Sequence, residues 1–392
     1  MSLEPLPSQI SYAVQHIHTT PRRFVLNFAG AGSTALAWLH AQAGSSRSII
    51  EAVDRYAQAS LIEAVGYEPS SYTSVEVAVA LAKQAYERAE VLEPSSAQTG
   101  LSFGVGLTAT IATGRTKRGD HRVAIASYDG LGILQLDLVL TKGARTRSQE
   151  EELVGRLLLY VISLASGVRA PTNSLLAGLL ASETLTSQFT PQLSWQIENT
   201  QKPELIYIDQ HMQVSLPDSY PNALLLPGSF DPLHAGHLEL ARAASDHSGR
   251  PASFELALTN ADKGEIDLLR AYSRVTQFVT EAPVILSRNS LFVDKAHFFP
   301  NSIFVVGADT ATRLMDTRFY DHSKPAMLAA LTNLREAGCS FLVASRKSVR
   351  SQQLVQLADL SIPAGFEDMF TALEFRMDIS SSQLRRAASE AH

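Results

Sequence analysis

The sequence contains a single cysteine, Cys339, in 392 residues. One thiol excludes an intrachain disulfide and suits a reducing compartment. Residues 1–7 lack the charged and apolar regions of a signal peptide. No apolar run approaches the roughly 18 residues that a membrane-spanning helix needs. These absences predict a cytoplasmic protein without a membrane anchor.

The chain also has little excess of charge of either sign. The chain has 33 Lys and Arg against 39 Asp and Glu, which gives a formal net charge of −6 at pH 7. This balance argues against a general nucleic-acid binder and against adhesion to anionic membranes. Any affinity for phosphate must therefore come from a local site. We expect small-molecule substrates as partners and leave a homo-oligomer open.

What the chain does contain is a strand, a glycine turn and two histidines in one stretch. The apolar run 224–226, followed by Pro-Gly, predicts a strand stopped by a turn. Gly228 has no Cβ, so the backbone there can approach a bulky anion closely. We expect a helix over about 236–247 whose N-terminal N–H groups point at that anion. His234 and His237, three residues apart, share one side of its first turn.

The ten residues from Gly228 to His237 read Gly-Ser-Phe-Asp-Pro-Leu-His-Ala-Gly-His. They resemble the signature of the nucleotidylyltransferase superfamily, Gly-x-Phe-Asp-Pro-x-His-x-Gly-His, at every fixed position. The resemblance implies that His234 and His237 are catalytic. It also implies that Gly228, Ser229 and Phe230 contribute to the nucleotide site.

A second segment, 379–385, reads Ile-Ser-Ser-Ser-Gln-Leu-Arg. It resembles the Ile-Ser-Ser-Thr-x-x-Arg element of the same superfamily, with Ser382 in place of threonine. A serine followed three residues later by glutamine is a capping-box pattern that opens a helix. We expect Ser381, Ser382 and the guanidinium of Arg385 to grip triphosphate oxygens. Arg385 is the third catalytic candidate.

Weaker matches lie between these segments, in the order of the family. Lys263, Gly307, Asp309 and Arg346 each follow a predicted strand. The loop that contains Lys263 resembles the segment in which pyridine-nucleotide adenylyltransferases place a substrate-binding lysine. The family uses Gly-x-Asp to hold nucleotide hydroxyls, because a carboxylate accepts two ribose O–H bonds. Arg346 stands where the family often carries an arginine.

The resemblance also implies the chemistry. A phosphate of the acceptor would attack the α-phosphorus of ATP in line, and pyrophosphate would leave without a covalent enzyme intermediate. Positioning and charge neutralisation would then carry the rate. Mg²⁺ would bridge the triphosphate oxygens, held mostly by substrate and water. The sequence has no carboxylate cluster of the kind that builds a metal cage.

The length and a hydrophobic content of 45% predict two globular domains. Within 222–392, strands near 224, 254, 283, 303 and 341 alternate with helical segments. This alternation is typical of a parallel, doubly wound, Rossmann-like α/β sheet. Such sheets bind ligands beyond the carboxyl ends of their strands. Residues 171–221, which contain several Pro, Asn and Ser residues, are expected to be a linker.

The N-terminal residues 1–170 predict a separate α/β domain. An apolar strand enters the loop Ala-Gly-Ala-Gly-Ser-Thr-Ala at 29–35. The order of elements over residues 21–168 resembles the C-terminal domain of CinA, the nicotinamide-mononucleotide deamidase family. That family has Ala-Glu-Ser-Cys-Thr-Gly-Gly in its nucleophile loop, whereas Gly30 and Ala31 replace its glutamate and serine here. We predict a domain without deamidase activity that binds a nucleotide, regulates or mediates dimer contacts.

Both resembled families handle nicotinamide mononucleotide or its acid. This association predicts transfer of AMP from ATP to nicotinamide or nicotinate mononucleotide, a step of NAD metabolism. Two alternatives stay open. One is a cytidylyltransferase acting on a small phosphorylated alcohol, and the other is a non-catalytic nucleotide-binding sensor or scaffold. The triphosphate that is consumed separates the first alternative, and a His237 substitution that keeps binding separates the second.

Overall fold

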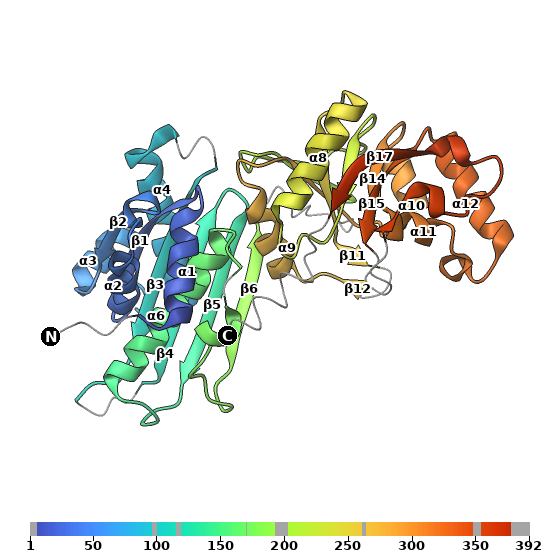
Figure 1. Cartoon of the computed structure of the whole chain (residues 1–392). Coiled ribbons are helices and arrows are strands. Elements are labelled where there is room, and N and C mark those ends of the chain that lie inside the picture. Colours follow the sequence, from blue (N-terminus) through green and yellow to red (C-terminus); the bar gives the residue numbers. More distant parts are fainter. Residues whose placement is uncertain are drawn as a thin grey trace. The chain divides into compact units, whose positions relative to one another are not determined.

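The computed structural model describes residues 6–95, 100–114, 119–169, 171–192, 203–260, 264–347 and 354–377. The chain divides into two compact units. The first contains residues 1–196, 210–213 and 268–281. The second contains residues 197–209, 214–267 and 282–392. Each unit is an α/β body built around its own sheet (Figure 1).

The first unit has a six-stranded sheet of order β2-β1-β3-β4-β5-β6. Its strands are β1 (Arg23–Ala29), β2 (Ile49–Asp54), β3 (Ser102–Thr110), β4 (His121–Asp129), β5 (Gly132–Leu140) and β6 (Leu185–Pro191). Strands β2, β1 and β3 are parallel, and the pairs from β3 to β6 are antiparallel. β3 is buried along almost its whole length, whereas β5 alternates between buried and more exposed residues. The sheet is therefore most deeply buried in its central strands β1, β3 and β4, whereas the edge strand β2 is only partly buried.

The helices of the first unit are α1 (Ser8–Thr19), α2 (Ser33–Ala41), α3 (Gln58–Val65), α4 (Val75–Leu92), α6 (Arg147–Ala165), α7 (Thr172–Leu175) and α9 (Leu268–Val275). Short 3-10 turns lie at Ser45–Arg47 and Thr276–Phe278. α4 starts because the Ser74 hydroxyl accepts the N–H of Val77 at 3.2 Å, an N-cap bond. Thr146 and Gln149 form a capping box at the start of α6.

Small residues set the close packing of α4 on the sheet. At Gly104 and Gly106 of β3, a Cβ would lie 2.0 Å and 2.1 Å from carbonyl oxygens of α4. Only glycine permits this separation between helix and strand. Because side chains alternate along a strand, Leu107 points to the opposite face of the sheet. There it lies near Gly32, which Leu158 of α6 also approaches. α4 and α6 therefore cover opposite faces of the sheet.

The second unit has a nine-stranded sheet with the path β16-β15-β14-β9-β10-β13-β7-β8, and β17 pairs with β15. Its strands are β7 (Leu205–Ile208), β8 (Val214–Ser215), β9 (Leu224–Pro227), β10 (Ala252–Ala257), β13 (Val284–Ser287), β14 (Ile303–Gly307), β15 (Ser340–Lys347), β16 (Leu354–Val355) and β17 (Phe370–Met377). The short strands β11 (Thr259–Asn260) and β12 (Gly264–Glu265) form a separate antiparallel pair.

Six strands of this sheet, β9, β10, β13, β14, β15 and β17, pair in parallel. Numbered along the chain, they lie in the spatial order third, second, first, fourth, fifth, sixth. This is the strand order of doubly wound nucleotide-binding sheets. The predicted Rossmann-like α/β class is confirmed, including the five strands expected near 224, 254, 283, 303 and 341.

The helices of the second unit are α8 (Ala235–Ser248), α10 (Phe292–Phe298), α11 (Ala308–Leu314) and α12 (Lys324–Glu336). Short 3-10 turns lie at Thr317–Tyr320, Leu357–Asp359 and Glu367–Met369. The core contains stacked aromatic rings, with centroids 5.7 Å apart for Phe304 and Phe341 and 5.1 Å apart for Phe341 and Phe370. These rings fix β14, β15 and β17 against one another.

The stretch expected to be a linker, 171–221, supplies strands to both sheets. β6 completes the first sheet, and β7 and β8 extend the second as antiparallel strands. The apolar run 205–208 is strand-like already in the sequence, but local composition does not show which remote strands these segments pair with. Among the helices in the described ranges, none is both long and apolar enough to cross a bilayer.

Candidate functional site

The turn after β9 lies where the order of the parallel sheet reverses. β9 and β14 are the first and fourth parallel strands, and they are neighbours through Leu224 with Ile303 and Leu225 with Phe304. Connections leave two such strands in opposite lateral directions and open a crevice beyond their carboxyl ends. β9 ends at Pro227 and β14 ends at Gly307. The predicted Gly228 and Asp309 segments thus start from adjacent strand ends.

Gly228 has a different local role from the one expected for an anion-approach glycine. Its N–H donates to the Glu255 carbonyl oxygen at 2.9 Å, which continues the pairing of β9 with β10. A Cβ on Gly228 would lie 2.6 Å from the ring of Phe230. The missing side chain is therefore the space that the Phe230 ring fills.

The buried side chain of Phe230 anchors the turn after β9. Its side chain is only 1% exposed, and its backbone has a φ of 46°, in the left-handed region. The ring meets Phe254 and His237 edge to face, with centroids 5.3 Å and 5.1 Å away. Phe230 was predicted to bind the nucleotide, but its ring is buried in the core. It contributes by fixing His237, while the neighbouring Ser229 is exposed.

His234 and His237 lie together at the start of α8, both half-buried. Their rings stack with centroids 3.7 Å apart and planes 20° apart. The N–H of His234 donates to Nδ1 of His237 at 3.3 Å. Because Nδ1 accepts this bond, the proton of the neutral His237 ring sits on Nε2. The His237 ring is thereby prepared as a hydrogen-bond donor through Nε2.

At the neighbouring strand end, Gly307 precedes α11 as its N-cap residue and Asp309 lies in the first turn. Both are half-buried. The Gly-x-Asp pair thus occupies a strand end beside the histidine turn, as the topology requires. Arg346 belongs to the end of β15, where it pairs with Val355 and Met377 through the backbone.

Four predicted residues, Lys263, Ser381, Ser382 and Arg385, lie outside the described residues. The strand before the last three is described. β17 runs parallel to β15 and ends at Met377, paired with Arg346. The chain therefore leaves the sheet toward 379–385 from the same carboxyl edge that carries the histidine turn.

A buried ion pair near this turn was not predicted from the sequence. Lys295 Nζ of α10 lies 2.6 Å from Glu255 Oε2, and their side chains are 4% and 0% exposed. The Ser287 hydroxyl donates to the other oxygen of Glu255. Removing one partner would strand a buried charge at a cost of about 3 to 5 kcal/mol. The signal available in the sequence was a lone glutamate inside the apolar strand Phe-Glu-Leu-Ala.

The first unit has its own strand, glycine turn and helix, at β1 and α2. Gly30 has a φ of 87°, and a Cβ there would lie 1.9 Å from the Ala109 carbonyl oxygen. One oxygen of Glu151, Oε1, accepts three bonds from this turn. The donors are the N–H of Gly32 at 3.0 Å, the Ser33 hydroxyl at 2.9 Å and the N–H of Thr34 at 3.1 Å. A carboxylate of the chain itself thus occupies the donors that a phosphate would use.

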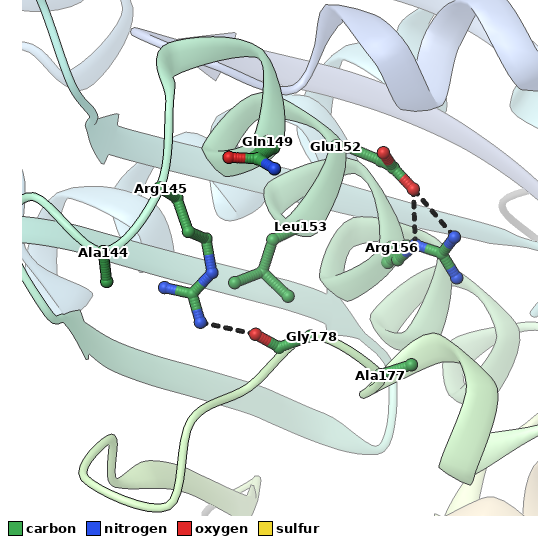
Figure 2. A pocket seen from close by; sticks show the side chains of 8 residues that line it. All are labelled: Ala144, Arg145, Gln149, Glu152, Leu153, Arg156, Ala177 and Gly178. Atoms are coloured by element: carbon green, nitrogen blue, oxygen red, sulfur yellow. Dashed lines mark hydrogen bonds and ion pairs between the residues drawn. The ribbon is translucent and has the colours of Figure 1, made fainter.

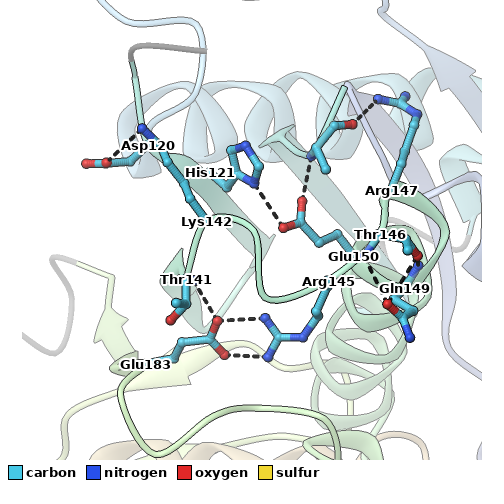
Figure 3. A network of polar contacts seen from close by, with 11 residues as sticks. Asp120, His121, Thr141, Lys142, Arg145, Thr146, Arg147, Gln149, Glu150 and Glu183 are labelled. Carbon is cyan, nitrogen blue, oxygen red and sulfur yellow. Dashed lines mark hydrogen bonds and ion pairs between the residues drawn. The ribbon is translucent and has the colours of Figure 1, made fainter. Parts of the chain in front are cut away.

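Negative charge accumulates around this turn. Burial, and then the neighbouring charge of Glu151, raises the pKa of Asp54 at the end of β2. The adjacent Glu150 is fully buried and accepts from His121 Nδ1 at 2.9 Å and from the Ala112 N–H at 2.6 Å (Figure 3). The start of α6 therefore holds the loops after β1 and β3 through two consecutive carboxylates.

The first unit also contains a cavity of about 300 Å³, beside the start of α6 (Figure 2). It is lined by Ala144, Arg145, Gln149, Glu152, Leu153, Arg156, Ala177 and Gly178. Arg145 is paired with both oxygens of Glu183, at 2.7 Å and 2.6 Å, and also donates to the Gly178 carbonyl (Figures 2 and 3). Arg156 is paired with Glu152 at 2.8 Å. Because both arginine charges are compensated internally, the cavity is not a strong anion site.

Within the described part of the chain, no group of three or more His, Cys, Asp or Glu side chains is arranged to hold a metal ion. The site residues that lie in the described ranges instead offer imidazoles, glycine turns and one carboxylate. Imidazoles, turn N–H groups and a carboxylate are groups that can hydrogen-bond phosphate and ribose oxygens.

A comparison with known protein families agrees with the nucleotidylyltransferase resemblance. Residues 225–387 match the sequence model of the family described as Cytidylyltransferase-like. The C-terminal part is thus a nucleotidylyltransferase-like domain. No curated protein sequence matches the chain.

Three solved structures are among those that are similar to part of this chain. The competence/damage inducible protein CihA from Agrobacterium tumefaciens is 19% identical, over 42% of this chain and 96% of that one, with a TM-score of 0.32. A CinA superfamily protein from Escherichia coli is 15% identical, over 41% and 92%, with a TM-score of 0.31. One from Enterobacter cloacae is 11% identical, over 42% and 95%, with a TM-score of 0.30.

Proposed function

We propose that this protein transfers AMP from ATP to nicotinamide or nicotinate mononucleotide and releases pyrophosphate. The observation that carries the transfer reaction is the complete Gly228–His237 signature placed at the reversal point of a doubly wound sheet. The match of residues 225–387 to the Cytidylyltransferase-like family supports nucleotidyl transfer. The choice of a pyridine mononucleotide rests on the two sequence resemblances.

In this mechanism an acceptor phosphate oxygen forms a bond to the α-phosphorus, while the bond to the bridging oxygen of pyrophosphate breaks. Mg²⁺ enters with the triphosphate as part of the substrate. His234 and His237 donate hydrogen bonds to phosphate oxygens as negative charge develops, and the Nε2–H of His237 is the donor defined by the bond at Nδ1. Asp309 accepts ribose hydroxyls. Arg385, by the family resemblance, adds fixed positive charge.

A second candidate is cytidylyl transfer from CTP to a small phosphorylated alcohol. The matched family is described as Cytidylyltransferase-like, which makes CTP the first competing donor. The chemistry at phosphorus is the same, so only the base and the acceptor differ.

The test incubates the protein with Mg²⁺, either ATP or CTP, and one of three acceptors: nicotinamide mononucleotide, nicotinate mononucleotide or a small phosphorylated alcohol. Chromatography then reports dinucleotide and pyrophosphate. We expect NAD or its deamido form from ATP, reduced about 100- to 1,000-fold by His237→Ala because a transition-state donor is lost. His247→Ala, at the exposed far end of the same helix, is the matched control and should keep activity. Product from CTP with a phosphorylated alcohol instead would establish the second candidate. Tight triphosphate binding without turnover would identify a sensor.

A further inference from the structure

The buried ion pair of Glu255 and Lys295 has no part in the proposed chemistry. Lys295 Nζ of α10 lies 2.6 Å from Glu255 Oε2, and both side chains are almost fully buried. The ammonium group also lies 5.3 Å from the centre of the Phe292 ring. Burying two charges is costly, and an apolar pair of similar size often stabilises a protein as well. Stability alone therefore gives no reason for two charges at this position.

The pair is set into an apolar layer on one face of the sheet. Glu255 pairs with Ile285 of β13, and Ile285 belongs to the same buried cluster as Ala296 of α10. Side chains directly opposite each other on neighbouring strands share a face of the sheet. Glu255 therefore points to the face that α10 covers. There Lys295 and the Ser287 hydroxyl each bind one of its two oxygens.

The opposite face of β10 supports the histidine turn. Phe254 precedes Glu255 in the strand and points to that face, because side chains alternate along a strand. The Phe230 ring packs edge to face on Phe254 and on His237, with centroids 5.3 Å and 5.1 Å away. Two consecutive residues of β10 therefore contact the ion pair on one face and the support of His237 on the other.

The backbone joins the same two features. The N–H of Gly228 donates to the carbonyl oxygen of Glu255 at 2.9 Å, so the turn is bonded to the residue that carries the buried charge. Phe230 fills the space beside Gly228 that a Cβ would take. A displacement of Glu255 would therefore move this acceptor and the Phe254 ring together. All of these residues lie in the second unit.

Lys295 keeps Glu255 in this place. If the ammonium group were removed, only the Ser287 hydroxyl would remain of the two partners that the carboxylate has among the described residues. An uncompensated buried charge is strongly unfavourable. The strand would have to shift until water reaches the carboxylate, and the turn bonded to Glu255 would shift with it.

We propose that Lys295 is a positioning residue for His237. By neutralising Glu255 inside the sheet, Lys295 fixes the end of β10 that supports the histidine turn. This inference rests on the proposed function, because it assigns Lys295 to the geometry of a transition-state donor. Lys295 itself is not a substrate contact, since its side chain is 4% exposed. A donor acts fully only when it is held in place before charge develops at the phosphate oxygens.

The test compares full-length wild type with Lys295→Met, Glu255→Gln and the double variant that carries both changes. Methionine and glutamine are close in size to the residues they replace, so the double variant keeps the volume and removes both charges. Lys324→Met, at an exposed lysine that starts α12, controls for the loss of a lysine charge. Leu331→Ala, which truncates a fully buried side chain of α12, controls for a weakened second unit.

Two readouts separate position from stability. Heteronuclear NMR of the histidine rings reports which ring nitrogen of neutral His237 carries the proton, and His237→Ala assigns the signals. Initial rates with ATP and a pyridine mononucleotide give kcat and the KM of each substrate. All measurements are made under conditions where denaturation curves show each variant to be folded.

We expect Lys295→Met to mix the two tautomers of His237, because the bond from the His234 N–H to Nδ1 is displaced. The value of kcat should fall about 10- to 100-fold while both KM values stay within about threefold of wild type, since the lost interaction acts in the transition state. The double variant should recover the wild-type tautomer and a kcat within about threefold of wild type, because no buried charge is left unpaired. Lys324→Met and Leu331→Ala should match wild type in both readouts.

A wild-type His237 spectrum in Lys295→Met would overturn the positioning role. A double variant as slow as Lys295→Met would do the same, because the loss would then come from packing and not from the stranded charge. The same spectral change in Leu331→Ala would also overturn it, since any weakening of the unit would then move the ring. If Lys295→Met does not fold, Glu255→Gln strands the opposite charge and takes its place in the comparison. If no protein shows transfer, the spectra still decide the positioning role, and only the proposed function fails.

Discussion

The two units carry the same local arrangement, a parallel strand, a glycine turn and a helix, with opposite contents. The turn after β1 is filled by the Glu151 carboxylate, which accepts from Gly32, Ser33 and Thr34. The turn after β9 is lined by the stacked imidazoles of His234 and His237. An anion-binding backbone is therefore not by itself a ligand site. What the tertiary structure places over it decides its use.

Substituting the glycines of the two turns is expected to give the largest difference in effect between the two units. Gly30→Ala would force a Cβ to 1.9 Å from a carbonyl oxygen at a left-handed φ, so we expect a loss of about 2 to 5 kcal/mol in the first unit. Gly228→Ala would displace Phe230 and with it His237, and we expect transfer to fall about 10- to 100-fold. Denaturant unfolding and initial rates measure the two effects. Equal losses of transfer in both variants, with the first unit still folded, would contradict separate roles.

A second carboxylate of the first unit sharpens the comparison, since Glu183 also accepts loop N–H groups but is paired with an arginine. Arg145, with the N–H groups of Leu180 and Thr141, lowers the pKa of Glu183 to about 2. A folded pKa below the unfolded one stabilises the protein above about pH 4.5, and this contribution is lost as pH falls toward 2. We expect Glu183→Gln to cost about 2 to 3 kcal/mol at pH 7 and to flatten the acid side of the stability curve.

Chemical denaturation between pH 7 and pH 2.5 checks this prediction. Glu152→Gln is the matched control, because Glu152 is half exposed and pairs with Arg156 one turn away on the same helix. Its loss should be no more than about 1 kcal/mol. If the free energy of unfolding of wild type and of Glu183→Gln depends on pH in the same way, the network does not lower the pKa of Glu183 on folding.

The smallest expected effect comes from emptying the first turn. Glu151→Ala would leave the N–H groups of Gly32 and Thr34 without their acceptor, and we expect a loss of about 1 to 3 kcal/mol. Millimolar inorganic phosphate should then raise the Tm of the variant and not that of wild type, because it binds only the vacated turn. Transfer should be unchanged. A phosphate-dependent shift in wild type as well would show that Glu151 yields to external anions.

The sequence by itself determined the local segments and the reaction class. Apolar runs and Pro-Gly or glycine turns located five parallel strands of the second unit, near 224, 254, 283, 303 and 341. The residues from Gly228 to His237 predicted the transfer site. These signals are local, since backbone dihedrals, capping and hydrophobic periodicity act over one or two turns of chain. Resemblance carried the remaining site residues, several of which lie outside the described ranges.

Only the tertiary structure decided which remote groups meet. Glu151 reaches Gly32 across 119 positions, and Tyr272 reaches Asp129 across 143. It also showed that Gly228 makes room for Phe230, that the stretch 171–221 pairs into both sheets, and that α9 leaves the half that encodes it. No periodicity records such contacts, because they arise when separate apolar faces are buried together and every buried polar group must find a partner.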